Sequence, residues 1–177
     1  MDLHQALSES IQTGFINQQI QSEKSYRPEL LTNDHKQGKK VLSTILRELE
    51  TCDEFQFSVA FVTTGGIATL MNTLLALEKK NVQGKILASQ YLNFTQPEAL
   101  KRIKQFKNIE LRIATEGSFH SKGYLFKKKG VYDLIIGSSN LTQTALCSNK
   151  EWNLKVSAAE ESELISQTLK EFQKEFD

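Results

Sequence analysis

An imidazole and an ammonium group stand two positions apart in His120-Ser121-Lys122. Side chains at positions i and i+2 lie on one face of an extended chain, so both groups are expected to point into the same space. The ordinary pKa of histidine is about 6.5, so the ring can take up or release a proton near neutral pH. A triplet of this form is common by chance, and a surface histidine beside a surface lysine also explains it.

A second polar group follows the apolar stretch Val131 to Ile136, in Gly137-Ser138-Ser139-Asn140. The hydroxyl of Ser138 and the amide of Asn140 can donate hydrogen bonds to an anion. The glycine lets the backbone approach closely. The alternative is an ordinary connection after a strand, in which Asn140 caps a short helix that runs through Leu146.

Glu151 stands eleven residues after Asn140, at the beginning of a further predicted strand. It shares a face with Asn153 and Lys155, whereas Trp152 points to the opposite face and is expected in the core. A carboxylate beside an imidazole fixes the tautomer and the orientation of the ring. The three motifs together are more specific than any one of them.

The remaining metal-ligating residue types are scattered. His4 and His35 lie in polar surroundings and are expected on the surface. Cys52 and Cys147 are far apart and form no CxxC pair, which excludes a disulfide framework and a zinc finger. No Asp, Glu or His cluster has the spacing of metal ligands. The sequence therefore predicts no metal ion and no other cofactor.

The elements that position these residues follow from hydrophobic periodicity. Apolar residues three or four positions apart predict helices over 3–11, 41–49, 67–80, 97–106 and 164–176. Alternation and short apolar runs predict strands over 55–61, 85–88, 109–113, 122–126, 131–136 and 152–156. Early alternation of strands and helices, followed by a hairpin, predicts an α/β sandwich with a central mixed sheet flanked by helices.

Three further features were interpreted from local composition. Residues 1–40 are predicted to form an N-terminal helix and an irregular surface connection, ahead of one domain over 41–177. The run Lys127-Lys128-Lys129 is expected to form a solvated hairpin turn. Tyr124 and Phe126 share the nominal face of His120, and core packing is favoured over lining a site.

Composition restricts the class of protein. The chain has 177 residues, of which 39% are hydrophobic and 24% charged, so general disorder is excluded. Lys and Arg number 22 against 21 Asp and Glu, so any basic surface must be local. No apolar run is long enough to span a bilayer, and no secretory signal is visible. A cytoplasmic protein without a membrane partner is therefore expected.

The combination of HxK at 120–122, GSxN at 137–140 and Glu151 resembles the phospholipase D superfamily, the HKD phosphodiesterases. More narrowly, it resembles the single-motif bacterial nucleases of that superfamily. The resemblance runs from about Phe55 to the C-terminus and implies a PLD-like α/β sandwich. The full motif of the superfamily, HxKxxxxD, has an aspartate where this chain has Lys127.

A second resemblance concerns the first part of the chain. The stretch from Ser25-Tyr26-Arg27-Pro28 through Gln90-Tyr91-Leu92-Asn93 resembles the N-terminal segment of large bacterial superfamily 2 helicases. In those proteins a PLD-like domain precedes a DEAD/DEAH-type motor. No Walker A pattern occurs here, so the chain would be the nuclease-like domain without its motor.

The superfamily resemblance implies a two-step displacement at phosphorus. His120 would attack the phosphodiester, and Lys122 and Asn140, with Ser138, would hold the non-bridging oxygens. Glu151 would accept a hydrogen bond from the far ring nitrogen of His120. One motif supplies one histidine, so the second would come from another chain, in a two-fold homodimer with a shared active site.

The implied function is that of a metal-independent nuclease, with DNA favoured over RNA as substrate. The first alternative is a nucleic-acid-binding or dimerisation module of a helicase that has lost turnover, which the lysine at position 127 keeps open. The second is a phospholipase. It ranks lowest because such enzymes usually carry two motifs in one chain, and no membrane-binding amphipathic stretch is visible.

Overall fold

The computed structural model describes residues 2–90, 94–115 and 119–177, which form seven strands and six α-helices. The strands are β1 (Glu29–Leu31), β2 (Glu54–Val59), β3 (Gln83–Ser89), β4 (Ile109–Ala114), β5 (Lys122–Lys128), β6 (Val131–Gly137) and β7 (Asn153–Ala159). The helices are α1 (Leu3–Phe15), α2 (Val41–Thr51), α3 (Thr64–Lys79), α4 (Pro97–Ile103), α5 (Gln143–Cys147) and α6 (Glu163–Phe176), with a 3-10 turn at Lys24–Tyr26.

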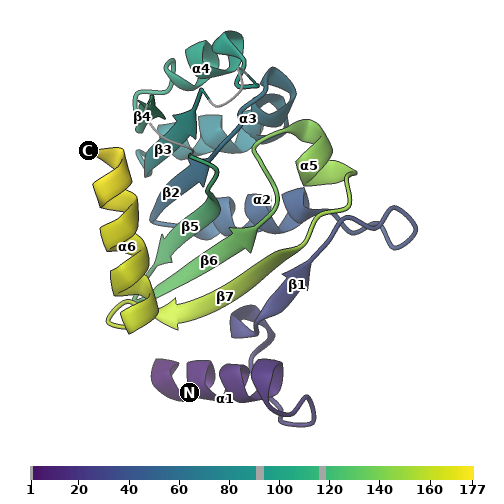
Figure 1. Ribbon diagram of the computed structural model, residues 1–177. Coiled ribbons are helices and arrows are strands. Elements are labelled where there is room, and N and C mark those ends of the chain that lie inside the picture. Colours follow the sequence, from purple (N-terminus) through teal and green to yellow (C-terminus); the bar gives the residue numbers. More distant parts are fainter. Residues whose placement is uncertain (1, 91–93, 116–118) are drawn as a thin grey trace.

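All seven strands belong to one mixed sheet, in the order β1-β7-β6-β5-β2-β3-β4. Strands β2, β3 and β4 are parallel, and the pairs β2–β5, β5–β6, β6–β7 and β7–β1 are antiparallel. Helices α2 and α3 lie on one face and α6 lies on the other (Figure 1). This architecture confirms the predicted α/β sandwich with a mixed sheet.

The alternation of strand directions brings the candidate site residues to one edge of the sheet. The carboxyl ends of β1, β2, β3, β4 and β6 and the amino ends of β5 and β7 meet there, because the antiparallel partners run the opposite way. Lys122, at the start of β5, pairs with Val59, and Gly137 pairs with Asn153. We call this the His120 edge, since His120 lies two residues before the start of β5.

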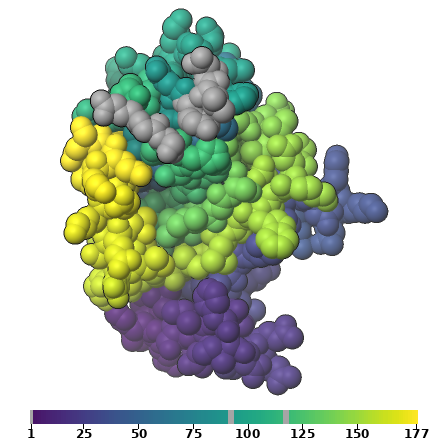
Figure 2. All heavy atoms as spheres, viewed as in Figure 1, coloured from purple at the N-terminus to yellow at the C-terminus, as the bar shows by residue number. Residues whose placement is uncertain are grey.

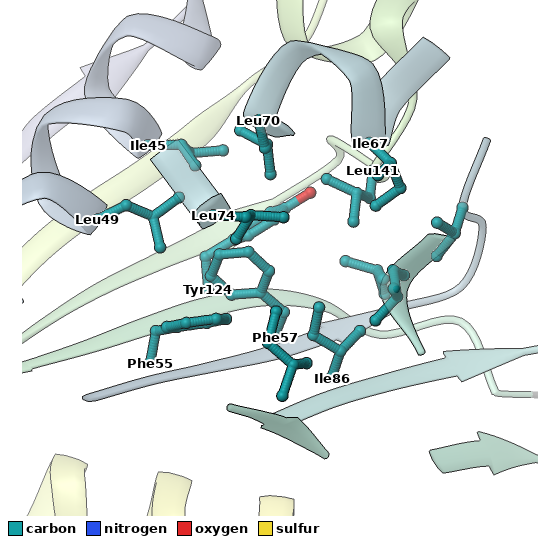
Figure 3. Close-up of a cluster of buried hydrophobic side chains, with 14 of the residues drawn as sticks. Ile45, Leu49, Phe55, Phe57, Ile67, Leu70, Leu74, Ile86, Tyr124 and Leu141 are labelled. Carbon is teal, nitrogen blue, oxygen red and sulfur yellow. The ribbon is translucent and has the colours of Figure 1, made fainter. Parts of the chain in front are cut away.

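The main core lies between the sheet and helices α2 and α3 (Figure 3). Phe57 is its centre, with its ring centroid 4.9 Å from that of Tyr124 and 5.7 Å from that of Phe126. Leu70 and Leu74 of α3 close over these rings. Core packing of Tyr124 and Phe126 is therefore confirmed, and neither ring lines the edge.

Helix α6 covers only part of the other face. Ile165 packs on Leu125 and Leu134, and Phe172 packs on Leu87 farther along the sheet. The hydroxyl of Ser162 begins the helix by accepting a hydrogen bond from Ile165 N at 3.3 Å. Toward the His120 edge this face carries no helix, and β5, β6 and β7 are visible there (Figure 1).

The connection over 18–40 is more ordered than predicted. It contains β1, which adds to the sheet by pairing Glu29 with Lys155 and Leu31 with Asn153. The prediction of an irregular connection is wrong here, because a strand of three residues shows no alternation and its partner lies more than 120 residues away. No helix of the described residues is long and apolar enough to cross a membrane.

The lysine run is also only partly a solvated turn. Lys127 and Lys128 complete β5, while Lys129 and Gly130 form the turn, with Gly130 at φ 73°. Lys128 Nζ lies 2.8 Å from Asp133 Oδ2 and also bonds to Glu48, so the prediction that Lys128 is solvated is wrong.

Lys128 belongs to a buried ion cluster, which we define as Glu48, Lys128, Asp133 and Lys155. Lys155 Nζ lies 3.1 Å from Asp133 Oδ1 and 3.6 Å from Glu48 Oε1. It also donates to the carbonyl of Ser25 at 2.9 Å, which fastens the N-terminal segment to the sheet. Burial opposes ionisation of Asp133, but Lys155 and Lys128 hold its pKa below the ordinary value.

Candidate functional site

The five residues predicted from motif spacing come together at the His120 edge. His120 and Lys122 stand at the start of β5, and Ser138 and Asn140 directly follow β6. Glu151 lies two residues before the start of β7. Because β5, β6 and β7 are neighbours in the sheet, three separate segments present these side chains on adjacent strand ends.

His120 and Lys122 are in direct contact. Lys122 Nζ lies 2.9 Å from His120 Nδ1 and 3.5 Å from Nε2, and it donates to the carbonyl of His120 at 2.7 Å. The imidazole is exposed and the lysine is half-buried. Burial lowers the pKa of Lys122, and the carboxylate of Glu151 partly opposes this. The imidazole and the ammonium group thus lie side by side, as the i, i+2 spacing predicts.

Glu151 is held beside this pair by Ser138. The Ser138 hydroxyl donates to the Glu151 carboxylate, and Trp152 N donates to the same hydroxyl at 3.1 Å. The charge of Glu151 acts on the pKa of Lys122 and also on that of Tyr124. The pKa of Tyr124 is raised, mainly by burial and in addition by the charge of Glu151. The carboxylate therefore acts electrostatically on residues in the first half of β5.

Gly137 allows this arrangement. A Cβ at this position would lie 2.2 Å from the carbonyl oxygen of Trp152 and 2.6 Å from the Cα of Asn153. No side chain fits at these distances, so any substitution would push β6 away from β7. The close approach places Ser138 against Glu151, since Ser138 follows Gly137 and Glu151 lies two residues before Asn153, the cross-strand partner of Gly137.

Asn140 presents a free amide donor. Its Oδ1 accepts a hydrogen bond from Phe61 N at 3.0 Å, which fixes the side chain. Its Nδ2 has no partner within residues 2–90, 94–115 and 119–177. The alternative in which Asn140 caps a helix is wrong: Thr142 is the cap of α5 and accepts from Ala145 N at 3.2 Å.

Two aromatic residues at the site were missed by sequence reasoning. The ring centroid of Phe61 lies 5.9 Å from that of His120 in an edge-on arrangement, and 5.1 Å from that of Phe94. The apolar alternation predicts that Phe61 belongs to a strand, but β2 ends at Val59, and Phe61 lies between β2 and α3. No signal pointed to Phe94. The neighbouring residues 91–93, part of the helicase resemblance, lie outside the described residues.

Trp152 lies outside the core. Its exposed fraction is 74%, and the prediction that it is buried is wrong. It points to the sheet face that α6 leaves uncovered, together with Leu154 and its cross-strand partner Ile136, which are both exposed. Asn153, on the opposite face, is buried and donates to Ser139 Oγ at 2.9 Å. In β7 the covered face is thus the polar one.

Lys127 stands at the far end of β5. It pairs with Glu54 across the sheet, and its Nζ lies 3.0 Å from Glu160 and 5.7 Å from the centroid of Tyr132. Five residues of strand separate it from Lys122, or about 17 Å. The position at which the superfamily motif has an aspartate is therefore filled by a cation with its own acidic partner, remote from His120.

No metal site is evident in the part of the chain that the structure describes. Among the described residues, no group of three or more His, Cys, Asp or Glu side chains could hold a metal ion. His4 and His35 are exposed, as predicted, and His4 pairs with Glu161 at 3.1 Å. Both cysteines are free, and burial raises the pKa of the Cys52 thiol to about 12.

Comparisons with known proteins agree on the fold. The family model described as "Cardiolipin synthase, PLD-like domain" matches residues 45–176, and no curated protein matches the chain. NucT from Helicobacter pylori is similar in structure at a TM-score of 0.64 and 14% identity, covering 84% of this chain and 94% of NucT. Nuc from Salmonella typhimurium, a phospholipase D family member, is similar at 0.63 and 19%, with the same coverage. The phosphatidylserine synthase of Haemophilus influenzae is similar at 0.64 and 14%, covering 84% of this chain and 38% of the synthase.

Proposed function

We propose, from the premise that this chain belongs to the PLD-like domain family, that it hydrolyses phosphodiester bonds of nucleic acid without a metal ion. The observation that carries the proposal is the contact of His120 Nδ1 with Lys122 Nζ at 2.9 Å. An amide donor, a hydroxyl and a carboxylate lie on the adjoining strand ends. A nucleophile, a cation and neutral donors are the groups that a metal-free displacement at phosphorus requires.

In the first step, His120 attacks phosphorus. A P–N bond forms, the P–O bond to the leaving group breaks, and a second histidine donates the proton that the leaving oxygen takes up. Lys122 and the Nδ2 of Asn140 donate to the non-bridging oxygens, where charge develops. A phosphate is a stronger acceptor for the Lys122 ammonium than an imidazole nitrogen, so substrate binding would draw Lys122 away from the ring.

In the second step, water hydrolyses the P–N bond of the phosphohistidine. The second histidine, now neutral, takes the proton of the attacking water, and His120 is regenerated. Glu151, held by Ser138, would accept a hydrogen bond from His120 and thereby set its orientation. Glu151 is accordingly a positioning residue, whereas His120 is the catalytic residue.

The second histidine is proposed to be His120 of another copy. His4 is paired with Glu161, and His35 lies in the turn after β1, which is three strands away from β5, so neither stands beside His120. A two-fold axis brings the same surface of two copies together, so the two His120 edges would face each other. Mixing wild type with an excess of His120→Ala should remove activity, whereas full activity of the heterodimer would contradict the shared site.

The wider context is proposed on the same basis. Residues 41–177 would form the catalytic domain, acting on DNA rather than RNA in the cytoplasm. The domain would belong with a helicase motor in a longer protein, as the resemblance of the first part of the chain implies. The second candidate function is a binding module without turnover, which the lysine at position 127 favours.

The test is cleavage of single- and double-stranded oligonucleotides in EDTA. Wild type should cleave, and His120→Ala should lose all measurable turnover, because a nucleophile cannot be replaced. Glu151→Gln should lose less, about ten- to a hundredfold, because an orienting group can be bypassed in part. His4→Ala, at an exposed histidine that pairs with Glu161, is the matched control and should keep full activity.

Other outcomes separate the alternatives. Activity that needs Mg²⁺ and survives His120→Ala would overturn the assignment. Binding of oligonucleotide without turnover in the wild type would favour the binding module. Release of headgroup from phosphatidylcholine vesicles, without cleavage of DNA or RNA, would make the protein a phospholipase.

A further inference from the structure

A basic turn projects from the same edge of the sheet as the candidate site. It comprises residues 34–40, and it follows β1, whose last residue Leu31 pairs with Asn153 at the start of β7. Three strand spacings of about 4.8 Å separate β1 from β5, so the base of the turn lies about 14 Å from Lys122 across the edge. Figure 2 shows the turn, in blue, standing out from the body of the molecule.

The cations of this turn are exposed and lack acidic partners. Lys36, Lys39 and Lys40 form no ion pair with any residue that the structure describes. The carboxylate of Asp34 is engaged in the turn itself, where Oδ1 accepts from the backbone N–H of Lys36 at 2.9 Å and of Gln37 at 3.1 Å. The chain as a whole carries a net charge of only +1, so this concentration of positive charge is local.

The turn is built to hold its shape. Asp34 and Lys39 exchange two backbone hydrogen bonds of 2.9 Å each, and Gly38 at φ 66° supplies the left-handed residue that closes the turn. The buried Asn33 anchors its base. Its Oδ1 accepts from Val41 N at 2.9 Å, and its Nδ2 donates to the carbonyl oxygens of Ala145 and Asn149.

Those two carbonyls belong to the segment that joins Asn140 to Glu151, so the turn and the site share one support. Between the turn and α5 lies a groove of about 310 Å³. Its walls include Lys39 and Lys40 on one side and Gln143, Thr144 and Ser148 on the other. The groove begins three residues after Asn140 in the chain, and Asp34, His35, Gly38 and Cys147 complete its lining.

We infer that this groove and turn bind the sugar–phosphate backbone of the nucleic acid on one side of the cleaved bond. The inference rests on the proposed function and names how its substrate is held. Exposed lysines and neutral donors match a chain of phosphates, because the carboxylate of Asp34, the acidic residue of the groove, is engaged by backbone N–H groups. Such contacts carry no base sequence. The distance of about 14 Å corresponds to roughly four steps of a strand at 3.4 Å each.

The test compares two variants of equal charge. The turn variant carries Lys36→Gln, Lys39→Gln and Lys40→Gln, and the control carries Lys101→Gln, Lys104→Gln and Lys107→Gln in and after α4. The control lysines are exposed and free of ion pairs with described residues, but they lie toward the start of β4, at the edge opposite His120. Circular dichroism and the urea midpoint check that both variants fold.

Binding is measured first, with a fluorescent 20-nucleotide strand and with the same strand as a duplex, over a range of salt concentrations. Each phosphate contact contributes about 0.7 to 0.9 to the slope of log affinity against log salt, so the turn variant should lose about 2 to 3 from this slope. At low salt its affinity should fall at least tenfold. The control should keep both the slope and the affinity of the wild type.

Turnover supplies the second measurement. The turn variant should have a raised KM for the oligonucleotide, but unchanged hydrolysis of bis(p-nitrophenyl) phosphate, which is too small to reach the turn. An unchanged salt slope in the turn variant, or an equal loss in the control, would overturn the inference. Binding is also measured in the His120→Ala background, which keeps the two proposals apart. Absence of turnover in the wild type would contradict the proposed nuclease activity. The salt slope of the turn variant alone decides whether the turn binds the sugar–phosphate backbone.

Discussion

The two ends of β5 carry the same residue type in opposite settings. Lys122, at the start, contacts the imidazole of His120 and stays half-buried without a salt bridge to any described residue. Lys128, at the end, is neutralised by Asp133 and Glu48. Burial lowers the pKa of Lys122, whereas at Lys128 the hydrogen bonds and charges of Asp133 and Glu48 outweigh burial and raise it. Here the lysine that lacks a salt bridge is the one available to a substrate anion.

The largest expected effect is at the structural end. Lys155→Met should reduce the free energy of unfolding by about 3–5 kcal/mol, because it leaves Glu48 and Asp133 buried with fewer cations. Urea unfolding would measure this. Turnover per folded molecule at low temperature should be unchanged. A loss of turnover without a loss of stability would contradict the purely structural role of Lys155.

The next effect is at the start of the strand. Lys122→Gln should lower kcat about 10²- to 10³-fold, because a donor to the transition-state charge is lost. Its urea midpoint should stay within error, since Lys122 makes no salt bridge that the structure describes. Lys129→Gln, on the exposed turn at the other end of the hairpin, is the matched control. Comparable activity of the two variants would remove Lys122 from the mechanism.

A pH profile separates the two ends in the same molecule. Lys122 has a lowered pKa, so its charge, and with it kcat, should be lost on the alkaline side at a pH below the ordinary lysine value of about 10.4. Asp133 has a lowered pKa, so its contribution to stability is present above its unfolded value of about 3.9 and is lost as the pH falls through its folded value. The alkaline loss of kcat through Lys122 should thus occur without unfolding, and the acid loss of stability through Asp133 should occur where Lys122 is fully charged. Coincident losses would contradict the separation.

The smallest effect is expected at position 127. Lys127→Asp restores the residue type of the superfamily motif, but the site is about 17 Å away along the strand. The exchange removes a partly exposed ion pair with Glu160, worth about 0–1 kcal/mol. Turnover should change less than twofold. A gain of tenfold or more would show that the lysine impairs the enzyme and would strengthen the binding-module alternative.

The difference between the two ends explains how far the sequence was informative. The candidate residues of the His120 edge were predicted from motif spacing together with the family resemblance, because HxK and GSxN each occupy one strand terminus and need only local geometry. The buried ion cluster was not found, because its members Glu48 and Lys155 lie 107 positions apart and each resembles an ordinary surface charge. Spacing in the sequence can thus indicate side chains that lie within a few residues of each other, but not partners that only the fold brings together.

Strand β7 shows the same limit in one element. Its alternation correctly separated Trp152 and Leu154 from Asn153 and Lys155, but Trp152 was expected in the core and is exposed. Period two distinguishes two faces and does not say which one a helix covers. Here the polar face is buried, because Lys155 meets Asp133 and Asn153 meets Ser139. Only the tertiary structure supplies those partners.

The pairing of β2 with β5 bears on how the chain folds. Val59 and Lys122 are 63 positions apart, whereas β5 and β6 are joined by a tight turn at Gly130. Local hairpins form faster than contacts across a long loop, so β5–β6–β7 is expected to be structured before β2 joins it. Phe61, His120 and Asn140 meet only at that later step. A nascent chain would therefore form the pairs of Asp133 with Lys128 and Lys155, which lie within these three strands, before the contacts of the His120 edge.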